Sequence, residues 1–349
     1  MRVLVTGGAG FIGSHVVDAL VANGHDVVVA DVLLPKAHDH PPTYLNEAAT
    51  FVPVDVRDRT ALEDLVRGCD AVSHQAAMVG LGLDFSDVTD YVSHNDLGTA
   101  ALLAALYASG FTGRLVIASS MVIYGEGAYL CDEHGDQRPG PRSHADLDAG
   151  RWEPACTRCA RPLRVMPTTE SQPADPRNVY AATKLHQEHL ALLYGRETGA
   201  SVAALRYHNV YGSRMPRDTP YAGVASIFRS ALERGDAPSV YEDGRQLRDF
   251  VHVEDVARAN VAALSNPDAR GCYNIASGTP HTVAEMASAL TASFDSVRTA
   301  QVTGDYRLGD VRHVTGSPER ANRELGWWPE IGFEEGMRAF ARQPSLLRR

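Results

Sequence analysis

The stretch Met1-Arg-Val-Leu-Val-Thr-Gly-Gly-Ala-Gly-Phe-Ile-Gly13 decides the fold of this 349-residue chain. Its apolar run Val3-Leu-Val5 is typical of a buried parallel strand, and the glycines that follow are typical of a tight turn into a helix. Gly7 allows the turn, Gly10 lets a phosphate approach the backbone, and Gly13 lets the helix pack closely on the strand. A helix N-terminus binds phosphate through its free amides. The predicted contacts with a dinucleotide are therefore Gly7, Gly10, Phe11, Ile12 and Gly13.

A second apolar run, Asp26-Val-Val-Val-Ala30, ends at Asp31, roughly 20 residues after the glycines. A carboxylate at this strand tip accepts hydrogen bonds from the adenosine ribose hydroxyls, and its charge repels a 2′-phosphate. The expected cofactor is therefore NAD, in preference to NADP.

Composition narrows the class of protein. The chain is 44% hydrophobic and 22% charged, as in an ordinary globular enzyme, and its formal net charge is −10. This charge disfavours nucleic acid or an anionic membrane as the main partner. Because the first strand begins at the N-terminus and the sequence contains no apolar run of about 18 residues, neither a secretory signal nor a membrane span is expected. A cytoplasmic location is the expectation.

Strand-like and helical patterns alternate along the chain, which predicts an α/β fold with a Rossmann-type, doubly wound parallel sheet. Further strands are expected at 51–55, 70–74, 114–118 and 201–207, and near Val251 and Tyr273. Helices are expected at 60–67, 86–108, 180–198, 222–234, 256–264 and 283–292. Ligand chemistry belongs at the carboxyl ends of such strands.

The division into domains follows from the same patterns. We expect an NAD-binding domain at 1–205 and a smaller, mainly substrate-binding lobe at 206–349, interleaved with the first. Residues 126–175 are rich in Pro, Gly, Arg and Asp and lack a sustained period. They are expected to form a cysteine-bearing insertion.

Tyr180-Ala-Ala-Thr-Lys184 places a phenol and an ammonium group on one helix face. Ionisation of tyrosine near pH 7 requires a pKa shift of about three units, or about 4 kcal/mol, which is about the Coulomb energy of one cation at about 4 Å before desolvation is subtracted. Lys184 together with an oxidised nicotinamide is therefore expected to make the tyrosine a base. An isolated pair of this kind is usually an ordinary surface turn, but the glycine turn upstream favours catalysis. Ser119 and Ser120 follow an apolar strand, where a hydroxyl can bind a substrate oxygen and share the proton path, although helix capping is the alternative.

Together these features resemble the extended short-chain dehydrogenase/reductase family, and within it the NAD-dependent nucleotide-sugar epimerases and dehydratases. The resemblance covers nearly the whole chain and rests on ordered motifs. They are Thr6-Gly-Gly-Ala-Gly-Phe-Ile-Gly13, Asp55-Val-Arg-Asp58, His74-Gln-Ala-Ala77, Ser119-Ser-Met-Val-Ile-Tyr-Gly125, Tyr180-Ala-Ala-Thr-Lys184, Arg206-Tyr-His-Asn-Val-Tyr-Gly212 and Arg248-Asp-Phe-Val-His-Val253.

The resemblance implies a role for each matching residue. Ser120, Tyr180 and Lys184 would be catalytic, and Tyr180 and Lys184 would also contact the cofactor. Asn209, Arg248, Arg312 and the pocket residue Met121 would meet the nucleotide-sugar substrate, with the two arginines on its pyrophosphate. A homodimer built on two helices per subunit is also implied. The remaining implied NAD contacts are Asp55, Val56, Gln75, Ala76, Ala77, Asn95 and Ser119.

The choice of reaction depends on the two residues after Ser120. The family's dehydratases carry an Asp-Glu pair there and its decarboxylases a Glu, whereas Met121 and Val122 can neither donate nor accept a proton. The expected function is therefore 4-epimerisation of a nucleoside-diphosphate sugar through a transient 4-keto sugar. The local sequence resembles the bacterial dTDP-L-rhamnose 4-epimerase-like members most. A 4-ketoreductase or dehydrogenase, and a non-catalytic NAD-binding scaffold or sensor, stay open as alternatives.

Two close pairs of potential metal ligands lie within the 126–175 segment: Cys131 with His134, and Cys156 with Cys159. Their spacing is typical of a closed, tetrahedral zinc site that staples a loop and does no chemistry. The alternative is that they are unrelated loop residues.

Overall fold

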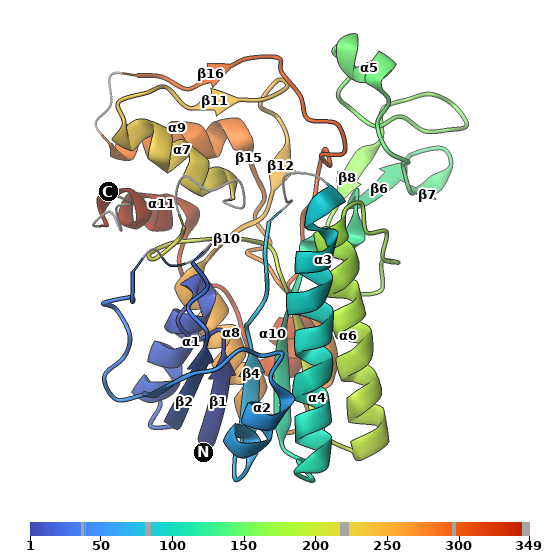
Figure 1. The fold of residues 1–349 in the computed structure, drawn as a ribbon. Helices are drawn as coiled ribbons and strands as arrows, with labels where there is room; N and C mark the ends of the chain where they lie inside the picture. Colours follow the sequence, from blue (N-terminus) through green and yellow to red (C-terminus); the bar gives the residue numbers. More distant parts are fainter. Residues whose placement is uncertain (36–37, 39, 81–84, 217–222, 295–297, 344–349) are drawn as a thin grey trace.

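The computed structural model describes residues 1–35, 38, 40–80, 85–216, 223–294 and 298–343. Its centre is a seven-stranded sheet in the order β14-β9-β5-β4-β1-β2-β3, in which all neighbouring strands are parallel (Figure 1). The predicted doubly wound α/β fold is confirmed. The strands are β1 (Arg2–Thr6), β2 (Asp26–Asp31), β3 (Thr50–Pro53), β4 (Ala71–His74), β5 (Arg114–Ser120), β9 (Ser201–Tyr207) and β14 (Gly271–Ile275).

Helices cover both faces of this sheet. On one face α1 (Phe11–Ala22), α8 (Val253–Ser265) and α10 (Glu319–Leu325) share a core with Val3 and Val5 of β1. On the other, α2 (Arg59–Val66), α4 (Gly98–Ala108) and α6 (Val179–Thr198) share a core with Leu4. Because β1 is buried on both faces, its central residues Val3, Leu4 and Val5 are all apolar.

The helix expected at 86–108 is divided in the structure. A 3₁₀ turn (Phe85–Asp87) and α3 (Val88–Tyr91) lead into a π-helical turn (Val92–Leu97) before α4 begins. Turns of this kind are frequent at functional sites. It carries Asn95, whose side chain is fully buried.

A smaller lobe lies above the carboxyl ends of the strands (Figure 1). Its helices α7 (Val224–Glu233), α9 (Val283–Ser293) and α11 (Phe333–Arg342) enclose a separate apolar core. Residue 222, where a helix was expected to begin, lies outside the described residues. The short strands of the smaller lobe are β10 (Asn209–Tyr211), β11 (Ser239–Val240), β12 (Leu247–Arg248), β13 (Phe250–His252), β15 (His281–Thr282) and β16 (Gln301–Val302). Since α8, α10 and β14 return to the main sheet, residues after 206 contribute to both parts; the domain bounds stay a prediction.

The cysteine-bearing segment, residues 126–175, forms structure that the sequence did not predict. Strand β6 (Ala128–Cys131) pairs antiparallel with β7 (Gly135–Gln137) and with β8 (Arg164–Met166), and a short helix α5 (His144–Asp148) follows β7. The segment projects beside the smaller lobe (Figure 1).

Candidate active site

The glycine turn between β1 and α1 leaves space only where a phosphate is expected. A Cβ atom on Gly13 would lie 2.0 Å from the carbonyl oxygen of Gly7, and one on Gly7, whose φ is +66°, would lie 2.5 Å from the nitrogen of Ala76. At Gly10 the nearest atom would be 3.3 Å away, and the helix start has no side-chain cap. The residues therefore fit a dinucleotide whose phosphate lies over Gly10 and the amides of Phe11 and Ile12.

Asp31 lies at the end of β2 beside this turn. Its carboxylate accepts hydrogen bonds from the backbone amides of Ala9 (3.0 Å) and Leu33 (2.9 Å). Further along the same edge, Asp55 is held by Arg57 and Val56 is buried. The hydrogen bond from Arg57 lowers the pKa of the Asp55 carboxyl.

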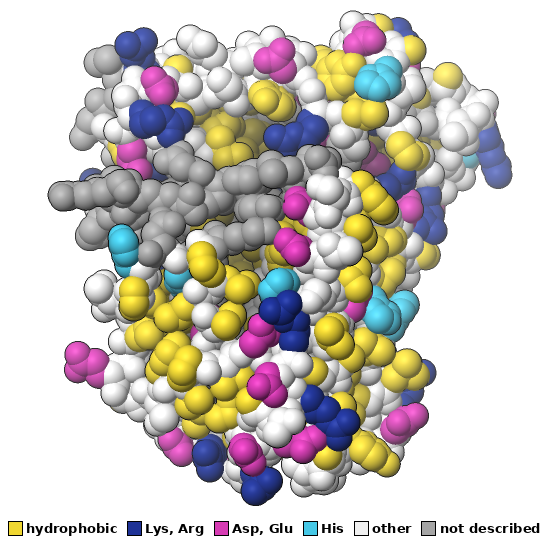
Figure 2. Space-filling model, viewed as in Figure 1, with side chains coloured by type: hydrophobic (Ala, Val, Ile, Leu, Met, Phe, Trp, Pro, Cys, Tyr) yellow, Lys and Arg dark blue, Asp and Glu magenta, His cyan; other side chains and the backbone are white. Residues whose placement is uncertain are grey.

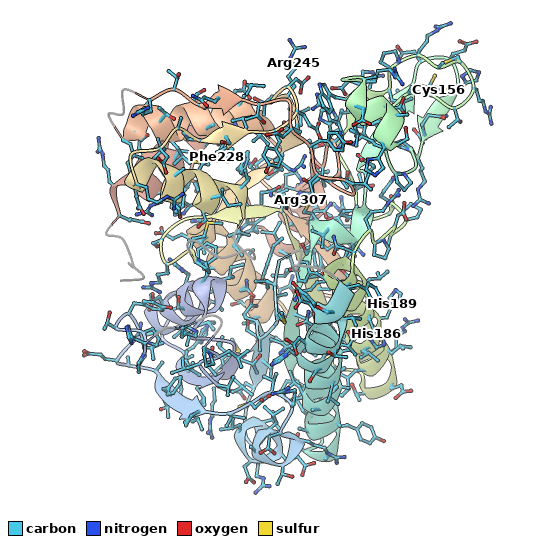
Figure 3. All side chains as sticks on the ribbon, turned by 45° about the horizontal axis from the view of Figure 1, so that its top comes forward. Cys156, His186, His189, Phe228, Arg245 and Arg307 are labelled. Atoms are coloured by element: carbon cyan, nitrogen blue, oxygen red, sulfur yellow. The ribbon has the colours of Figure 1, made fainter. Side chains whose placement is uncertain are left out.

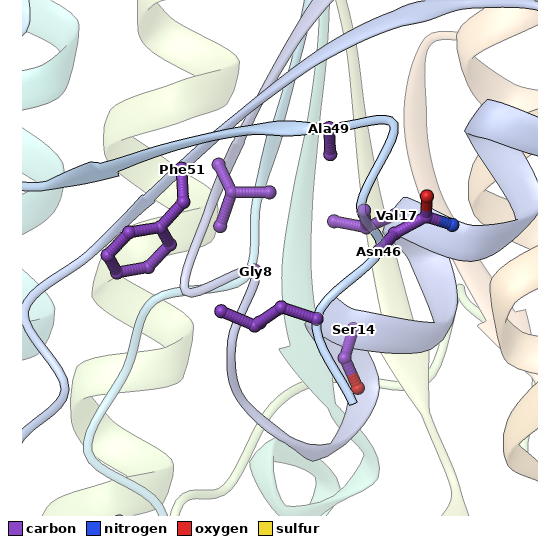
Figure 4. Close-up of a pocket in the computed structure, with 8 residues that line it drawn as sticks. Gly8, Ser14, Val17, Asn46, Ala49 and Phe51 are labelled. Carbon is purple, nitrogen blue, oxygen red and sulfur yellow. The ribbon is translucent and has the colours of Figure 1, made fainter. Parts of the chain in front are cut away.

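Behind the turn lies a cavity of about 10 Å³ lined by Gly8, Ser14, Val17, Val29, Leu45, Asn46, Ala49 and Phe51 (Figure 4). A space of this size holds about one water molecule. It is therefore a packing defect beneath the turn and not a substrate site.

The loop after β4 is braced by polar side chains. Asn95 accepts a hydrogen bond from the amide of Met78 (2.7 Å) and donates to the Met78 carbonyl and to Thr183 of α6. The Gln75 amide donates to Asn260 (2.9 Å) and accepts from Tyr207 (3.1 Å). These two side chains thus fix the loop, leaving the backbone of Ala76 and Ala77 at the glycine turn.

Ser120, Tyr180 and Lys184 come together between β5 and α6. Ser120 ends β5, Tyr180 lies in the first turn of α6, and Lys184 Nζ lies 5.9 Å from the Tyr180 ring centroid. Lys184 also donates a hydrogen bond of 2.8 Å to the carbonyl of Ala118 in β5. Asn178 caps α6 through the amide of Ala181, which fixes the start of the helix. The arrangement can hold and move a proton at a substrate oxygen.

Burial controls the acidity of these groups. It raises the pKa of Tyr180 to about 12, opposed by a hydrogen bond with Ser120, and it lowers the pKa of Lys184 to about 7, opposed by Glu188 and Asp96. Burial alone therefore favours the protonated phenol, and the lowering of its pKa by Lys184 together with an oxidised nicotinamide stays a prediction.

A buried polar network lies behind Ser120, Tyr180 and Lys184. Ser119 donates to Glu188 of α6, and Arg206 of β9 forms two hydrogen bonds with the same carboxylate, at 2.9 and 2.8 Å. Arg206 also donates to Tyr124, at 2.8 Å. The side chain of Ser119 is thus engaged in the core, whereas its neighbour Ser120 faces Tyr180. The sequence analysis missed Glu188, although it lies eight positions after Tyr180 on the same helix.

The four predicted substrate contacts have different surroundings. Met121 follows Ser120 and is half-buried, and Asn209 begins β10 with a buried side-chain oxygen that has no partner among the described residues. Arg248 donates to the carbonyls of Val311 and Arg312. The Arg312 guanidinium is fully buried and is surrounded by Glu153, Glu242 and Asp243, at 2.6 to 2.8 Å. Arg312 was predicted to bind the substrate diphosphate, but carboxylates of the protein already occupy its guanidinium. Within the described part of the chain, the other three predicted contacts have no carboxylate partner of this kind.

Arg307 is a candidate that the sequence analysis did not name. It is exposed, and it lies where the two lobes meet (Figure 3). Arg307 and Arg248 both act electrostatically on Asp310, so their charges converge. The sequence signal that could have identified Arg307 is its place two residues before Gly309, close to the predicted ligand Arg312.

The structure brings all four candidate metal ligands together at the tip of the cysteine-bearing segment, where Figure 3 labels Cys156. The thiol of Cys131 lies 3.6 Å from His134 Nδ1 and 3.7 Å from the thiol of Cys159, and the Cys156 thiol lies 3.5 Å from His134 Nδ1. In a tetrahedral zinc site, neighbouring sulfur and nitrogen ligands lie roughly 3.5–3.8 Å apart. Backbone amides of Arg158 and Cys159 lower the pKa of Cys156 to about 6, which favours the thiolate. The donor set therefore fits zinc.

The surface shows no continuous basic patch among the described residues on the face in Figure 2, where acidic and basic side chains are interspersed. Within the described ranges, no helix is long and apolar enough to cross a membrane.

Comparison with known proteins agrees with this geometry. Residues 3–144 and 158–276 match the family model described as the NAD dependent epimerase/dehydratase family. A dTDP-L-rhamnose 4-epimerase from Burkholderia thailandensis is 35% identical over 96% of this chain and 93% of its own length. Among solved structures, a Thermotoga maritima UDP-glucose 4-epimerase with UDP-glucose has a TM-score of 0.80 at 29% identity, covering 98% of this chain and 97% of that one. A Thermus thermophilus UDP-glucose 4-epimerase in complex with NAD has a TM-score of 0.75 at 32% identity, covering 98% of both chains.

Proposed function

Because the chain belongs to the NAD-dependent epimerase/dehydratase family, we propose that it is an NAD-dependent 4-epimerase of a nucleoside-diphosphate sugar. The observation that carries this proposal is the convergence of Ser120, Tyr180 and Lys184 at the carboxyl end of β5, on the same sheet edge as the glycine turn. Bound NAD supplies the hydride acceptor and donor of the reaction.

The chain's own residues handle the proton. The Ser120 side chain lowers the pKa of Tyr180, so the two side chains are near one another and both oxygens can contact the 4-hydroxyl of a sugar placed between them. Tyr180 takes the hydroxyl proton as the 4-keto sugar forms and returns it after the sugar has turned. A positive charge nearby favours the phenolate, and Lys184 together with the oxidised nicotinamide ring supplies it.

The residues after Ser120 favour epimerisation over the other reactions of the family. Met121 and Val122 lie in the 3₁₀ turn that follows β5, where an acid or base would have to act for elimination at the neighbouring carbon. Neither side chain exchanges a proton. These two positions therefore offer no acid or base for elimination, which favours reduction of the keto sugar.

The nucleotide is assigned to the smaller lobe. Arg248 and Arg307 carry the charges that suit a diphosphate, and the unpaired side-chain oxygen of Asn209 is a further polar contact. Similarity to the Burkholderia enzyme favours a 6-deoxy or otherwise modified sugar. Arg312 contributes to this site through the loop that it holds in place.

Incubation with nucleotide sugars tests the function. We expect purified enzyme to convert one of a panel of UDP-, dTDP- and GDP-sugars, including dTDP-L-rhamnose and UDP-glucose, into its 4-epimer without added reductant. NMR of the product and NAD released by denaturing the protein are the measurements. A stable keto product or net consumption of NADH would identify a ketoreductase or dehydrogenase, and NAD binding without turnover would identify a sensor.

We also propose that Cys131, His134, Cys156 and Cys159 hold a structural zinc ion. Metal analysis should give about one equivalent of zinc per chain, and Cys156→Ser should lose most of it, because three ligands hold zinc less tightly than four. Cys69→Ser is the matched control, since Cys69 lies outside the cluster. Less than about half an equivalent in the unaltered protein would contradict the assignment.

A homodimer completes the proposal. Apolar side chains are exposed along neighbouring helices: Leu97 at the end of the π-helical turn, Tyr107 near the end of α4, and Leu193 on α6, where Figure 3 labels His186 and His189. A second copy of the chain would cover them. The cytoplasmic location stays a prediction from the sequence.

A further inference from the structure

The cysteine-bearing segment forms hydrogen bonds with one loop of the smaller lobe along the whole length of that loop. This loop, residues 306–317, follows β16 and carries the candidate ligand Arg307. Its contacts with the segment include both backbone and side-chain hydrogen bonds. They are Gly127 N to His313 O (3.1 Å), Thr168 N to Thr315 O (2.9 Å), Ser317 N to Thr168 O (2.9 Å), Arg312 N to the Glu126 carboxylate (3.0 Å), and Tyr306 Oη to Asp148 (2.6 Å).

Glu153 of this segment contacts two consecutive side chains of the loop, those of Arg312 and His313. One of its oxygens accepts from Arg312 at 2.6 and 3.0 Å, and the other lies 2.8 Å from Nε2 of His313. Burial raises the pKa of Glu153, but hydrogen bonds from His313 and Arg312 outweigh burial and lower it to about 2. The carboxylate thus stays charged and holds two consecutive side chains of the loop.

The loop in turn fixes the candidate diphosphate ligand Arg248. The Arg248 guanidinium donates to the carbonyls of Arg312 (2.8 Å) and Val311 (2.7 Å), and Arg142 from the cysteine-bearing segment donates to the next carbonyl, that of Asp310 (2.7 Å). The position of Arg248 is therefore set by the backbone at 310–312. That backbone is held by Glu153 through Arg312.

Glu153 lies outside the ranges that the family model matches. The family model matches residues up to 144 and again from 158, so Glu153 and Cys156 both lie in the stretch between the matched ranges. Cys156 follows Glu153 by three residues and is one of the four clustered ligands. The segment beside it has a small core of Tyr129, Cys131, Cys156 and Leu163, too small to be rigid alone.

We propose that Glu153, anchored by the zinc site, is a positioning residue that sets loop 306–317 and hence Arg248 for the diphosphate of the substrate. This inference rests on the proposed function. Glu153 does not itself touch the substrate; it acts through Arg312. Loss of the carboxylate, or of the metal, should weaken nucleotide binding and leave proton transfer at Tyr180 intact.

Glu153→Gln in the NAD-loaded enzyme tests the proposal. The variant should fold, because Arg312 keeps Glu242 and Asp243 as partners. UDP, dTDP and GDP are each titrated calorimetrically into the unaltered enzyme. The nucleotide that binds most tightly is then used to measure Kd in the variant. Its Kd and the substrate KM should rise about tenfold, kcat should change less than about twofold, and zinc and NAD content should stay the same.

Two further variants complete the design. Glu133→Gln, in an exposed pair with Arg161 in the same segment, should bind the nucleotide as the unaltered enzyme does. Cys156→Ser should reproduce the weaker nucleotide binding as it loses zinc. Unchanged Kd in Glu153→Gln, or an equal fall in kcat, would overturn the positioning role, and zinc loss without a change in Kd would overturn the anchoring role. If none of the nucleotides binds the unaltered enzyme, the proposed function itself fails.

Discussion

Replacing Tyr180 by Phe should lower kcat about a thousandfold, because removal of a positioned acid–base group typically costs 10²–10⁴ in rate. The ring remains and keeps its packing against Tyr91, at 6.1 Å between centroids, so the fold and the cofactor site should be unaffected. NAD released from the denatured variant should match that from the unaltered enzyme. Turnover is measured with the sugar nucleotide identified in the incubation experiment.

Tyr194→Phe provides the matched control on the same helix. Tyr194 is also buried, but its hydroxyl donates to the Phe111 carbonyl, away from the catalytic residues. Its loss should cost about 1 kcal/mol of stability and leave kcat unchanged. Normal turnover by Tyr180→Phe would refute the mechanism.

Glu188→Ala should lower the free energy of unfolding by about 3–5 kcal/mol, the usual cost of leaving one member of a buried ion pair unpaired. Arg206 is 8% exposed and would lose both hydrogen bonds to this carboxylate, and Ser119 would lose its acceptor. Urea unfolding followed by circular dichroism measures the effect.

The control for this variant is Glu63→Ala. Glu63 pairs with Arg59 at 2.7 Å on the exposed side of α2, so its removal should cost about 0.3–0.5 kcal/mol. Equal effects of the two variants would mean that the Glu188 network contributes no more than a surface pair.

Local pattern accounts for what the sequence predicted well. The strand, turn and helix at Val3 to Gly13 need only residues near one another, and helical spacing was enough to pair Tyr180 with Lys184. The choice of Ser120 as their partner came from the family resemblance. The spacing of the two ligand pairs was likewise enough for the cysteine–histidine cluster.

Features that depend on distant contacts escaped the sequence analysis. The pairing of Arg312 with Glu153 spans 159 residues, so an arginine in a motif could not be told from one neutralised in the core. The π-helical turn around Asn95 was also missed, because an extra residue in a helical turn leaves the apolar spacing of the flanking helix almost unchanged. Segment 126–175 lacks the length of strand that would reveal a period.

The hydrogen bond from Lys184 to the Ala118 carbonyl joins the catalytic helix to the strand that ends at Ser120. In the proposed function, proton exchange would therefore occur on this joined strand and helix, whereas the smaller lobe would bind the nucleotide. A sugar attached to the bound nucleotide could then present either of its faces to this strand and helix. Such an enzyme would hold the diphosphate in one place and bind the two configurations at the reacting carbon about equally well, as interconversion in both directions demands.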